Sequence, residues 1–409
     1  MYRLASPIAT PRRRDASRSL ALAAWTVDAR RLERVMSSSP TPVARMVARV
    51  GACRGRDVMC DDLHARRREY IVPPTGALVA RLRHVVRDDR DLPLVFALVN
   101  VLSTVPITAL ALVRAVPSHF LGACYLAATF GVYLQRFVLA LHYSTHASAF
   151  RQDRAVGRAL NAVAPVILAP FFGIPSGVYA LHHSVMHHVE NNAQGRDLSS
   201  TEGFARDSVQ AFLLYWARFT FGSFVELPMY AIHTKRYGMA AQCVAGFIGT
   251  YVAYSYVASL NATAAFWIFI APYGISSFAL MFGNWSQHIF VDPDKPNCKY
   301  RNSYCAINHP DNQLTFNDGY HTIHHLNSKL HWAELPEQFV ATLDQFAKND
   351  GLIFDGVGFF DVGIAVMCGR LHWLADRYVN VGQPARSREE IVALLKHRLK
   401  PVPLAKKYV

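Results

Sequence analysis

Charged side chains are scarce in this chain of 409 residues, since Asp, Glu, Lys and Arg together make up only 18% of it. Soluble domains usually contain about 25% of such residues. Hydrophobic residues instead reach 52% and aromatic residues 12%, and the apolar residues gather in long runs. The composition therefore argues against a soluble protein and favours one that is embedded in a membrane.

Acidic residues are fewer than basic ones, 29 against 43, which gives a formal net charge of +14. No basic and aromatic module typical of nucleic-acid binding is present, so no nucleic-acid partner is expected. In a membrane protein such an excess marks the cytosolic side, and it attracts anionic lipid headgroups or an acidic protein. The seven cysteines are scattered without a CxxC motif, which predicts reduced thiols rather than a disulfide framework.

The two ends of the chain are polar. Residues 1–90 are rich in Arg, and we predict either a basic, disordered N-terminal extension or an organelle transit peptide, with no secretory signal peptide. Residues 346–409 are predicted to form a helical tail in the cytosol. Lys406 and Lys407 stand where a dilysine retrieval signal would lie, which favours the endoplasmic reticulum, with a plastid membrane as the alternative.

Four apolar runs are long enough to cross a bilayer as helices, and they lie at about 93–113, 120–141, 239–259 and 263–283. Basic residues precede the first and the third run, whereas the loops at 114–119 and 259–262 carry little or no charge. The positive-inside rule therefore predicts two hairpins whose open ends face the cytosol.

Two further apolar stretches carry residues that disfavour a straight crossing. The stretch 160–181 contains Pro165, Pro170 and Pro175, which predicts a bent, re-entrant or interfacial segment. The stretch 209–232 contains Arg218, Glu226 and Pro228, and we expect an interfacial helix there. The predicted fold is all-α, with about four transmembrane helices in two hairpins within residues 91–345, capped by a cytosolic helical metal-binding domain.

Histidines gather in four short segments, each close to the end of an apolar stretch. Residues four apart in a helix share one face, so paired imidazoles in such segments point the same way. The predicted topology places all four segments on the same side of the membrane. They lie at the ends of apolar helices, where isolated titratable groups are energetically costly. The segments are "HYSTH" with His142 and His146, "HHSVMHH" with His182, His183, His187 and His188, "NWSQH" with Asn284 and His288, and "HTIHH" with His321, His324 and His325.

Leaving His182 aside, nine imidazoles are available, which is more than one tetrahedral zinc ion takes. They suit two metal ions with four or five nitrogen ligands each, and imidazole binds iron, copper and zinc alike. A membrane setting favours iron with O2, because an unactivated methylene must be oxidised rather than hydrolysed. A zinc-dependent hydrolase would leave most of these histidines unexplained, and a non-catalytic metal-binding membrane protein is the remaining alternative.

The boxes HxxxH, HxxxHH and HxxHH, separated by paired membrane spans, resemble the three histidine boxes of the membrane fatty acid desaturase family. The segments "NWSQHIF" and "FNDGYHTIHHLNSKLHWAELP" are also similar to this family's pattern. The resemblance implies a desaturase that uses O2 and two electrons at two iron ions to introduce a double bond into a lipid acyl chain. A lipid hydroxylase of the same superfamily is the alternative, because both reactions use the same oxidant.

The resemblance also implies the ligand set. The nine ligands would be His142, His146, His183, His187, His188, His288, His321, His324 and His325, with Asn284 as an auxiliary ligand through water. The middle box has one residue more than usual before its HH pair, so His182 is an alternative to His183 as its first ligand. We favour His183, because it lies four residues before His187 and would share its helix face.

Further side chains near the boxes are candidates for supporting roles. Asp318 and Glu190 either accept hydrogen bonds from ligand imidazoles or are simply solvated charges. Trp285 and Trp332 either shape the acyl channel or belong to an aromatic belt. No HPGG haem motif is present, so the resemblance implies a separate electron donor, either cytochrome b5 or ferredoxin. The acyl carrier, CoA or a membrane lipid, stays open.

Overall fold

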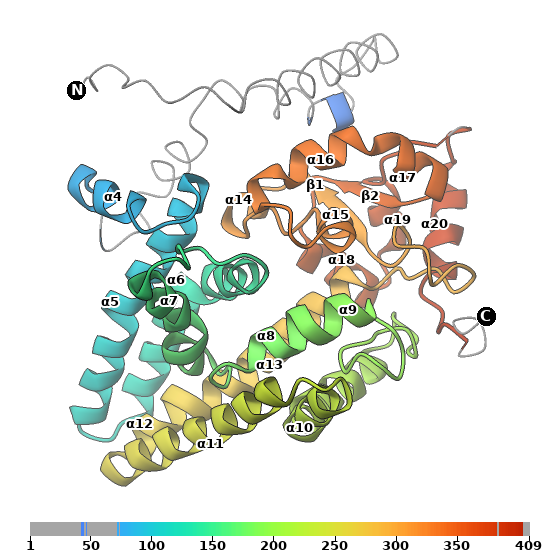
Figure 1. Cartoon of the computed structure of the whole chain (residues 1–409). Helices are drawn as coiled ribbons and strands as arrows, with labels where there is room; N and C mark the ends of the chain where they lie inside the picture. Colours follow the sequence, from blue (N-terminus) through green and yellow to red (C-terminus); the bar gives the residue numbers. More distant parts are fainter. Residues whose placement is uncertain (1–41, 45, 47–71, 73, 383, 404–409) are drawn as a thin grey trace, which may run out of the picture.

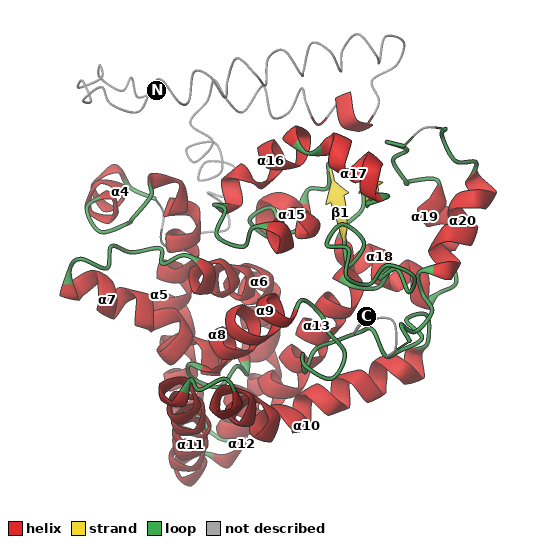
Figure 2. Cartoon of the chain, turned by 45° about the vertical axis from the view of Figure 1, so that its right-hand side comes forward, coloured by secondary structure: helices red, strands yellow, loops and turns green. Residues whose placement is uncertain are grey.

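The computed structural model describes residues 42–44, 46, 72, 74–382 and 384–403. This part of the chain is mostly helical, and its strands form one two-stranded sheet (Figures 1 and 2). The membrane-type helices lie together, and the segments from β1 to α20 form a separate cap of short elements (Figure 1).

Five described helices are long and apolar enough to cross a membrane: 89–114, 119–146, 155–172, 237–260 and 262–287. Four of them coincide with the predicted spans, and the fifth overlaps the stretch 160–181 that is predicted to be bent. The four are α5 (Leu92–Arg114), α6 (His119–His146), α11 (Tyr237–Leu260) and a last helix made of α12 (Ala262–Ala265), η6 (Phe266–Ile270) and α13 (Ala271–Gln287).

The tips of the two hairpins are joined by one side chain. Asn261 separates α11 from α12, and its Oδ1 accepts a hydrogen bond from the peptide N–H of Ala264 at 3.0 Å. Its Nδ2 donates to the carbonyl oxygens of Val113, in the last turn of α5, and of Ala115, just beyond that helix, at 3.3 and 3.2 Å. Both tips therefore lie at the same end of the helices, away from the histidine boxes.

The stretch after the first hairpin bends as predicted. It consists of α7 (Ala155–Ala162), a π-helical turn η3 (Val163–Leu168) and a 3-10 turn η4 (Ala169–Phe172), followed by Gly173 in the left-handed region with φ of 69°. Phe172 stacks on Phe137 of α6 at 4.1 Å between ring centroids. The chain then returns through α8 (Val178–Ala180) to the second histidine box.

The helix α10 (Val209–His233) is the predicted interfacial helix, and it is not among the five candidate spans. It packs on α11 and α13, and it exposes Phe221 and Met229. Arg218 and Glu226 form an exposed ion pair at 2.9 Å on the same helix. Its place at the membrane surface stays a prediction.

The cap joins segments from both sides of the predicted boundary at residue 345. Strand β1 (Tyr304–Ile307) pairs in parallel with β2 (Leu352–Asp355), so the expectation of an all-α fold is wrong at this sheet. Within the predicted C-terminal tail, the segment Leu352–Asp355 thus belongs to the same sheet as Tyr304–Ile307. The other elements are α14 (Asp311–Leu314), α15 (His321–Leu326), η7 (Trp332–Glu334), α16 (Leu335–Ala341), α17 (Leu343–Asn349), α18 (Phe359–Met367), α19 (Leu371–Ala375) and α20 (Arg388–His397).

The N-terminal stretch predicted to be disordered is partly ordered. Its last part forms α4 (Gly76–Arg83), which the side chain of Thr75 caps. Val43 and Met46 are buried, and the hydroxyl of Tyr320 lies 2.9 Å from the sulfur of Met46. Residues 1–41, 45, 47–71 and 73 of the proposed extension lie outside the described residues, as do the two lysines of the C-terminal motif.

Candidate metal centre

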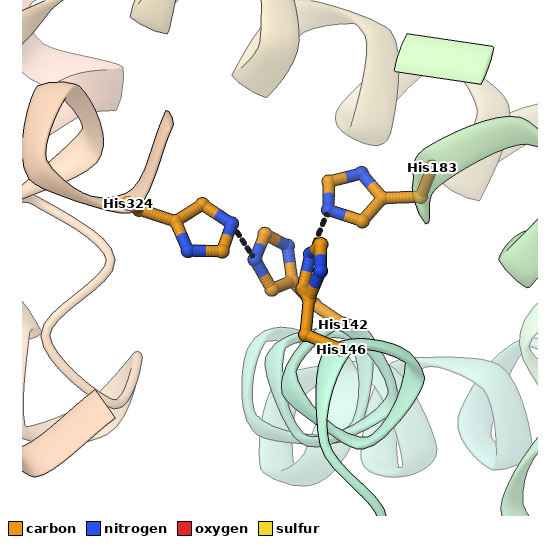
Figure 3. Close-up of side chains that lie close together, drawn as sticks. All are labelled: His142, His146, His183 and His324. Carbon is orange, nitrogen blue, oxygen red and sulfur yellow. Dashed lines mark hydrogen bonds between the residues drawn. The ribbon is translucent and has the colours of Figure 1, made fainter. Parts of the chain in front are cut away.

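The last turn of α6 supplies the first two imidazoles, and both point towards the cap. Figure 3 shows His142 and His146 rising from α6 between His183 on one side and His324 on the other. The Nε2 atoms of His142 and His324 lie 2.9 Å apart, as do those of His146 and His183. These four residues form a group, here called group A, whose ligand atoms all lie within 4.8 Å of one another.

A second set of four imidazoles, group B, lies beside the first. Its ligand atoms also fall within 4.8 Å of one another. It combines the second box, the end of α13 and α15, which are far apart in the sequence. Its members are His187, His288, His321 and His325.

The ninth imidazole lies between the two groups. The Nε2 of His188 is 3.1 Å from the Nε2 of His183 in group A. Its ring centroid is 4.4 Å from that of His146 in group A and 4.4 Å from that of His325 in group B. All nine sequence-predicted histidines are thus brought together.

The middle box reaches this arrangement because its backbone is π-helical. The turn η5 (Leu181–His187) leads into α9 (His188–Glu190), and the peptide N–H of His188 bonds to the carbonyl of His183. This i to i+5 pattern has more residues per turn than an α-helix, so it brings residues five apart closer to the same face. The extra residue of the box is thereby absorbed, and His183 and His188 both face the centre.

Several imidazole nitrogens lack hydrogen-bond partners within the described structure, which suits metal binding. Buried polar atoms are nearly always hydrogen-bonded, yet five ring nitrogens here are buried without a partner in the described structure: Nε2 of His187, Nδ1 of His321, Nδ1 of His324 and both nitrogens of His325. Burial, together with the neighbouring imidazoles, lowers the pKa of His183, His188, His321, His324 and His325 well below the usual value. Neutral imidazole is the form that binds metals.

The family model for fatty acid desaturases matches residues 116–356, more than half of the chain, and this range includes all nine histidines. This chain belongs to the fatty acid desaturase family. No curated protein and no solved structure matches the chain. Membership of this family implies an oxidoreductase, and the apolar helices indicate a membrane protein.

Two ring nitrogens on the outer side of group B are held by hydrogen bonds, which turns the opposite nitrogen of each ring inwards. The Nδ1 of His187 lies 2.7 Å from the Oδ2 of Asp197, and the Nδ1 of His288 lies 2.9 Å from the carbonyl oxygen of Asn302. Burial raises the pKa of the Asp197 carboxyl, but His187 outweighs it and holds that pKa well below its usual range. Asp197 is therefore a buried carboxylate.

Sequence reasoning missed Asp197 and chose Glu190 instead. Glu190 accepts a hydrogen bond from Tyr230 at 2.8 Å and lies 3.8 Å from Arg196, so its described partners are not imidazoles. The signal that was available is the position of Asp197 in "GRDLSS", in the loop that follows the middle box.

Asp318, the other predicted supporting carboxyl, does lie at the centre. It is buried, and its Oδ1 is 3.8 Å from the Nε2 of His142. Gln287 donates a hydrogen bond to Oδ2 at 2.6 Å, and the hydroxyl of Tyr143 lies 3.5 Å from Oδ1. Burial raises the pKa of Asp318 to about 7.

His182 and Asn284 occupy the wall around the two groups. The Nε2 of His182 lies 3.0 Å from the hydroxyl of Ser199, which itself donates to Asp197. His182 is in neither group, whereas His183 is in group A. Asn284 donates from Nδ2 to the carbonyl of Ser199 and to the hydroxyl of Tyr215, at 3.0 and 2.7 Å.

A largely apolar cavity of about 490 Å³ leads from the histidines into the helices. It follows α6 from His142 to Phe130 and α13 from Gln287 to Tyr273. Neither Trp285 nor Trp332 lines it, so their proposed role in shaping the channel is wrong. Trp285 is fully buried and donates to the carbonyl of Arg206, while Trp332 donates to Asp91.

Proposed function

We propose that this protein is a membrane-bound desaturase that introduces a double bond into a lipid acyl chain. The observation that carries the proposal is the position of groups A and B, joined by His188, at the end of the apolar cavity. A metal centre that borders a hydrocarbon-sized cavity suits oxidation of a methylene. The nine histidines would hold two iron ions, and such a centre supplies an oxidant for unactivated C–H bonds, which side chains lack.

The protein's own residues would position the acyl chain and orient the metal-binding histidines. The apolar walls from α6 and α13 hold a hydrocarbon chain and exclude water, while Asp197 and the carbonyl of Asn302 orient His187 and His288. In the overall reaction two hydrogen atoms leave adjacent carbons, and O2 takes them up with two protons and two electrons to give two waters. The electrons come from a separate donor, cytochrome b5 or ferredoxin.

For the membrane arrangement we propose four crossings, with 155–172 as a re-entrant segment. The support is geometric: His146 and His183 are 2.9 Å apart through their Nε2 atoms, so the chain between them starts and ends on one face. The endoplasmic reticulum is the favoured location.

The test is expression of the chain in a host that lacks the activity, followed by mass spectrometry of its lipids with the double-bond positions mapped. A new acyl species that has lost two hydrogens supports desaturation. A species that has gained an oxygen atom would show hydroxylation instead. Unchanged lipids in the presence of iron-loaded protein and a working donor would refute both.

A further inference from the structure

The helix α18 of the cap turns an apolar stripe outwards. Phe360, Ile364 and Met367 lie three or four residues apart, so they share one face of the helix. Phe360 and Met367 are half-buried, and Ile364 is 53% exposed. Among the described residues after position 288, Ile364 is the only exposed large hydrophobic side chain. An apolar stripe on a surface that otherwise lacks such side chains indicates contact with a partner.

The stripe continues the exposed apolar surface of α13. Figure 1 shows α18 on the side of the cap next to α13, and the ring of Phe360 stacks on that of Phe282 at 5.9 Å between centroids. Phe282 shares a face of α13 with Phe278 and Ile275, which are 43% and 47% exposed. The apolar surface therefore runs from the membrane span onto α18.

The contact between the two helices lies at the depth where interfacial helices bind. Phe282 follows Ala262, the first residue of this membrane span, by twenty residues, which is about 30 Å of helix. The apolar core of a bilayer is also about 30 Å thick. The helix α18 thus lies where the core meets the headgroups on the side of the histidines, and the exposed Arg370 just beyond it suits their phosphates.

We infer that α18 is a membrane-contact helix, whose exposed stripe lies in the lipid leaflet on the histidine side of the bilayer. The inference rests on the proposed crossings and extends the membrane surface of the protein to the cap. Phe360 belongs to the stripe and also lines the acyl cavity. The helix therefore holds that end of the cavity at the level of the headgroups, beside the lipids of the leaflet.

A crosslinking experiment identifies the molecule that covers the stripe. The full chain is reconstituted in vesicles of phosphatidylcholine and phosphatidylserine, with photoreactive benzoylphenylalanine in place of Ile364. The control carries the same label in place of Ala341, which is exposed at the end of α16 on the opposite side of the cap from α18 (Figures 1 and 2). A third variant carries it in place of Phe278, which is exposed on the membrane span α13.

The labels at positions 364 and 278 should both form adducts with lipid, whereas the label at 341 should form none. If position 278 labels lipid but position 364 does not, or labels a protein instead, the inference is wrong and the crossings stand. Equal lipid labelling at 341 and 364 would also overturn it. No lipid adduct at 278 would refute the proposed crossings together with the inference.

The unmodified cysteines supply a second readout, mapped by mass spectrometry of the peptides. Cys368 is exposed beside the stripe, whereas Cys298, in the loop before β1, is half-buried. In vesicles, water-soluble iodoacetamide should nevertheless alkylate Cys298 faster, because a thiol in apolar surroundings forms little thiolate. Ile364→Asp should speed alkylation of Cys368 by roughly tenfold, which corresponds to the transfer free energy of one partly exposed isoleucine, while Ala341→Asp leaves the rate unchanged. Faster alkylation of Cys368 than of Cys298 in the parent chain, or no change in Ile364→Asp, would contradict the leaflet contact.

Discussion

His183 and His188 are five residues apart in the chain, yet their Nε2 atoms lie 3.1 Å apart. In a regular α-helix the fifth residue is turned away from the first by about 140°. The π-helical hydrogen bond from the N–H of His188 to the carbonyl of His183 reduces this rotation. The same turn leaves His182 on the outside, beside Ser199.

The two adjacent histidines of the middle box should therefore behave differently. His183→Ala removes a member of group A and is expected to abolish product formation and to lower the iron content. His182→Ala removes a hydrogen bond to Ser199 and a ring contact with Phe219 but no member of either group, so iron and measurable activity should remain. Product formation in a host that lacks the activity, with protein amount checked by immunoblot, decides this. An inactive, iron-free His182→Ala beside an active His183→Ala would reverse the assignment.

The purified protein is expected to contain about two irons per chain and no stoichiometric zinc, because eight imidazoles form two groups of four with a ninth between them. Elemental analysis measures this directly. Replacing one member of group B, such as His288→Ala, should reduce the iron content and abolish activity. His309 contacts Asp311 and Asp361 and lies outside both groups, so His309→Ala serves as the control. One zinc and no iron would contradict the centre.

Asp197→Asn is expected to weaken metal binding or activity by roughly 10- to 100-fold. Asp197 accepts from Ser199 with one oxygen and faces His187 with the other, and Asn supplies only one acceptor and no charge. The iron content and the rate are measured together on the same preparation. Glu190→Gln is the matched control, because Glu190 faces Tyr230 and Arg196. Equal losses in both variants would argue against a specific role for Asp197.

Turnover should require an added electron donor, since the chain has no HPGG haem motif. Purified protein with NADH alone is expected to be inactive, and cytochrome b5 or ferredoxin with its reductase should restore the reaction. Because the chain carries a net charge of +14, an acidic donor is attracted electrostatically, and the rate should fall as salt screens this attraction. Product formed with NADH as the sole addition would disprove the need for a donor.

The two hairpin tips should face the side opposite the histidines. Val116, in the first tip, is 82% exposed, and Asp153, just after the first box, is also exposed. In intact membranes whose cytosolic side faces outwards, an impermeant maleimide should react with Asp153→Cys. Val116→Cys should react only after the membrane has been permeabilised, because it lies on the opposite side. The parent chain gives the background from its exposed Cys124 and Cys368. Reaction of both from one side would refute the arrangement of four crossings.

Local sequence features determined much of this protein. The length of an apolar run fixes where a helix can span a bilayer, and four runs became α5, α6, α11 and the helix 262–287. Prolines predicted the bend in 160–181. Histidine spacing predicted that His142 and His146 share a face of α6, because residues four apart are neighbours in an α-helix.

Other features were decided only by contacts between distant segments. His142 and His324 are separated by 182 residues in the sequence. Strand β2 pairs with β1 although the two strands lie on opposite sides of the predicted domain boundary at residue 345. The choice of Asp197 over Glu190 depends on how the loop after the middle box folds back onto His187. The sequence shows which side chains are available, but their burial and direction depend on packing. Packing therefore decides that the carboxyl of Asp197 contacts an imidazole and that Trp285 and Trp332 do not line the cavity.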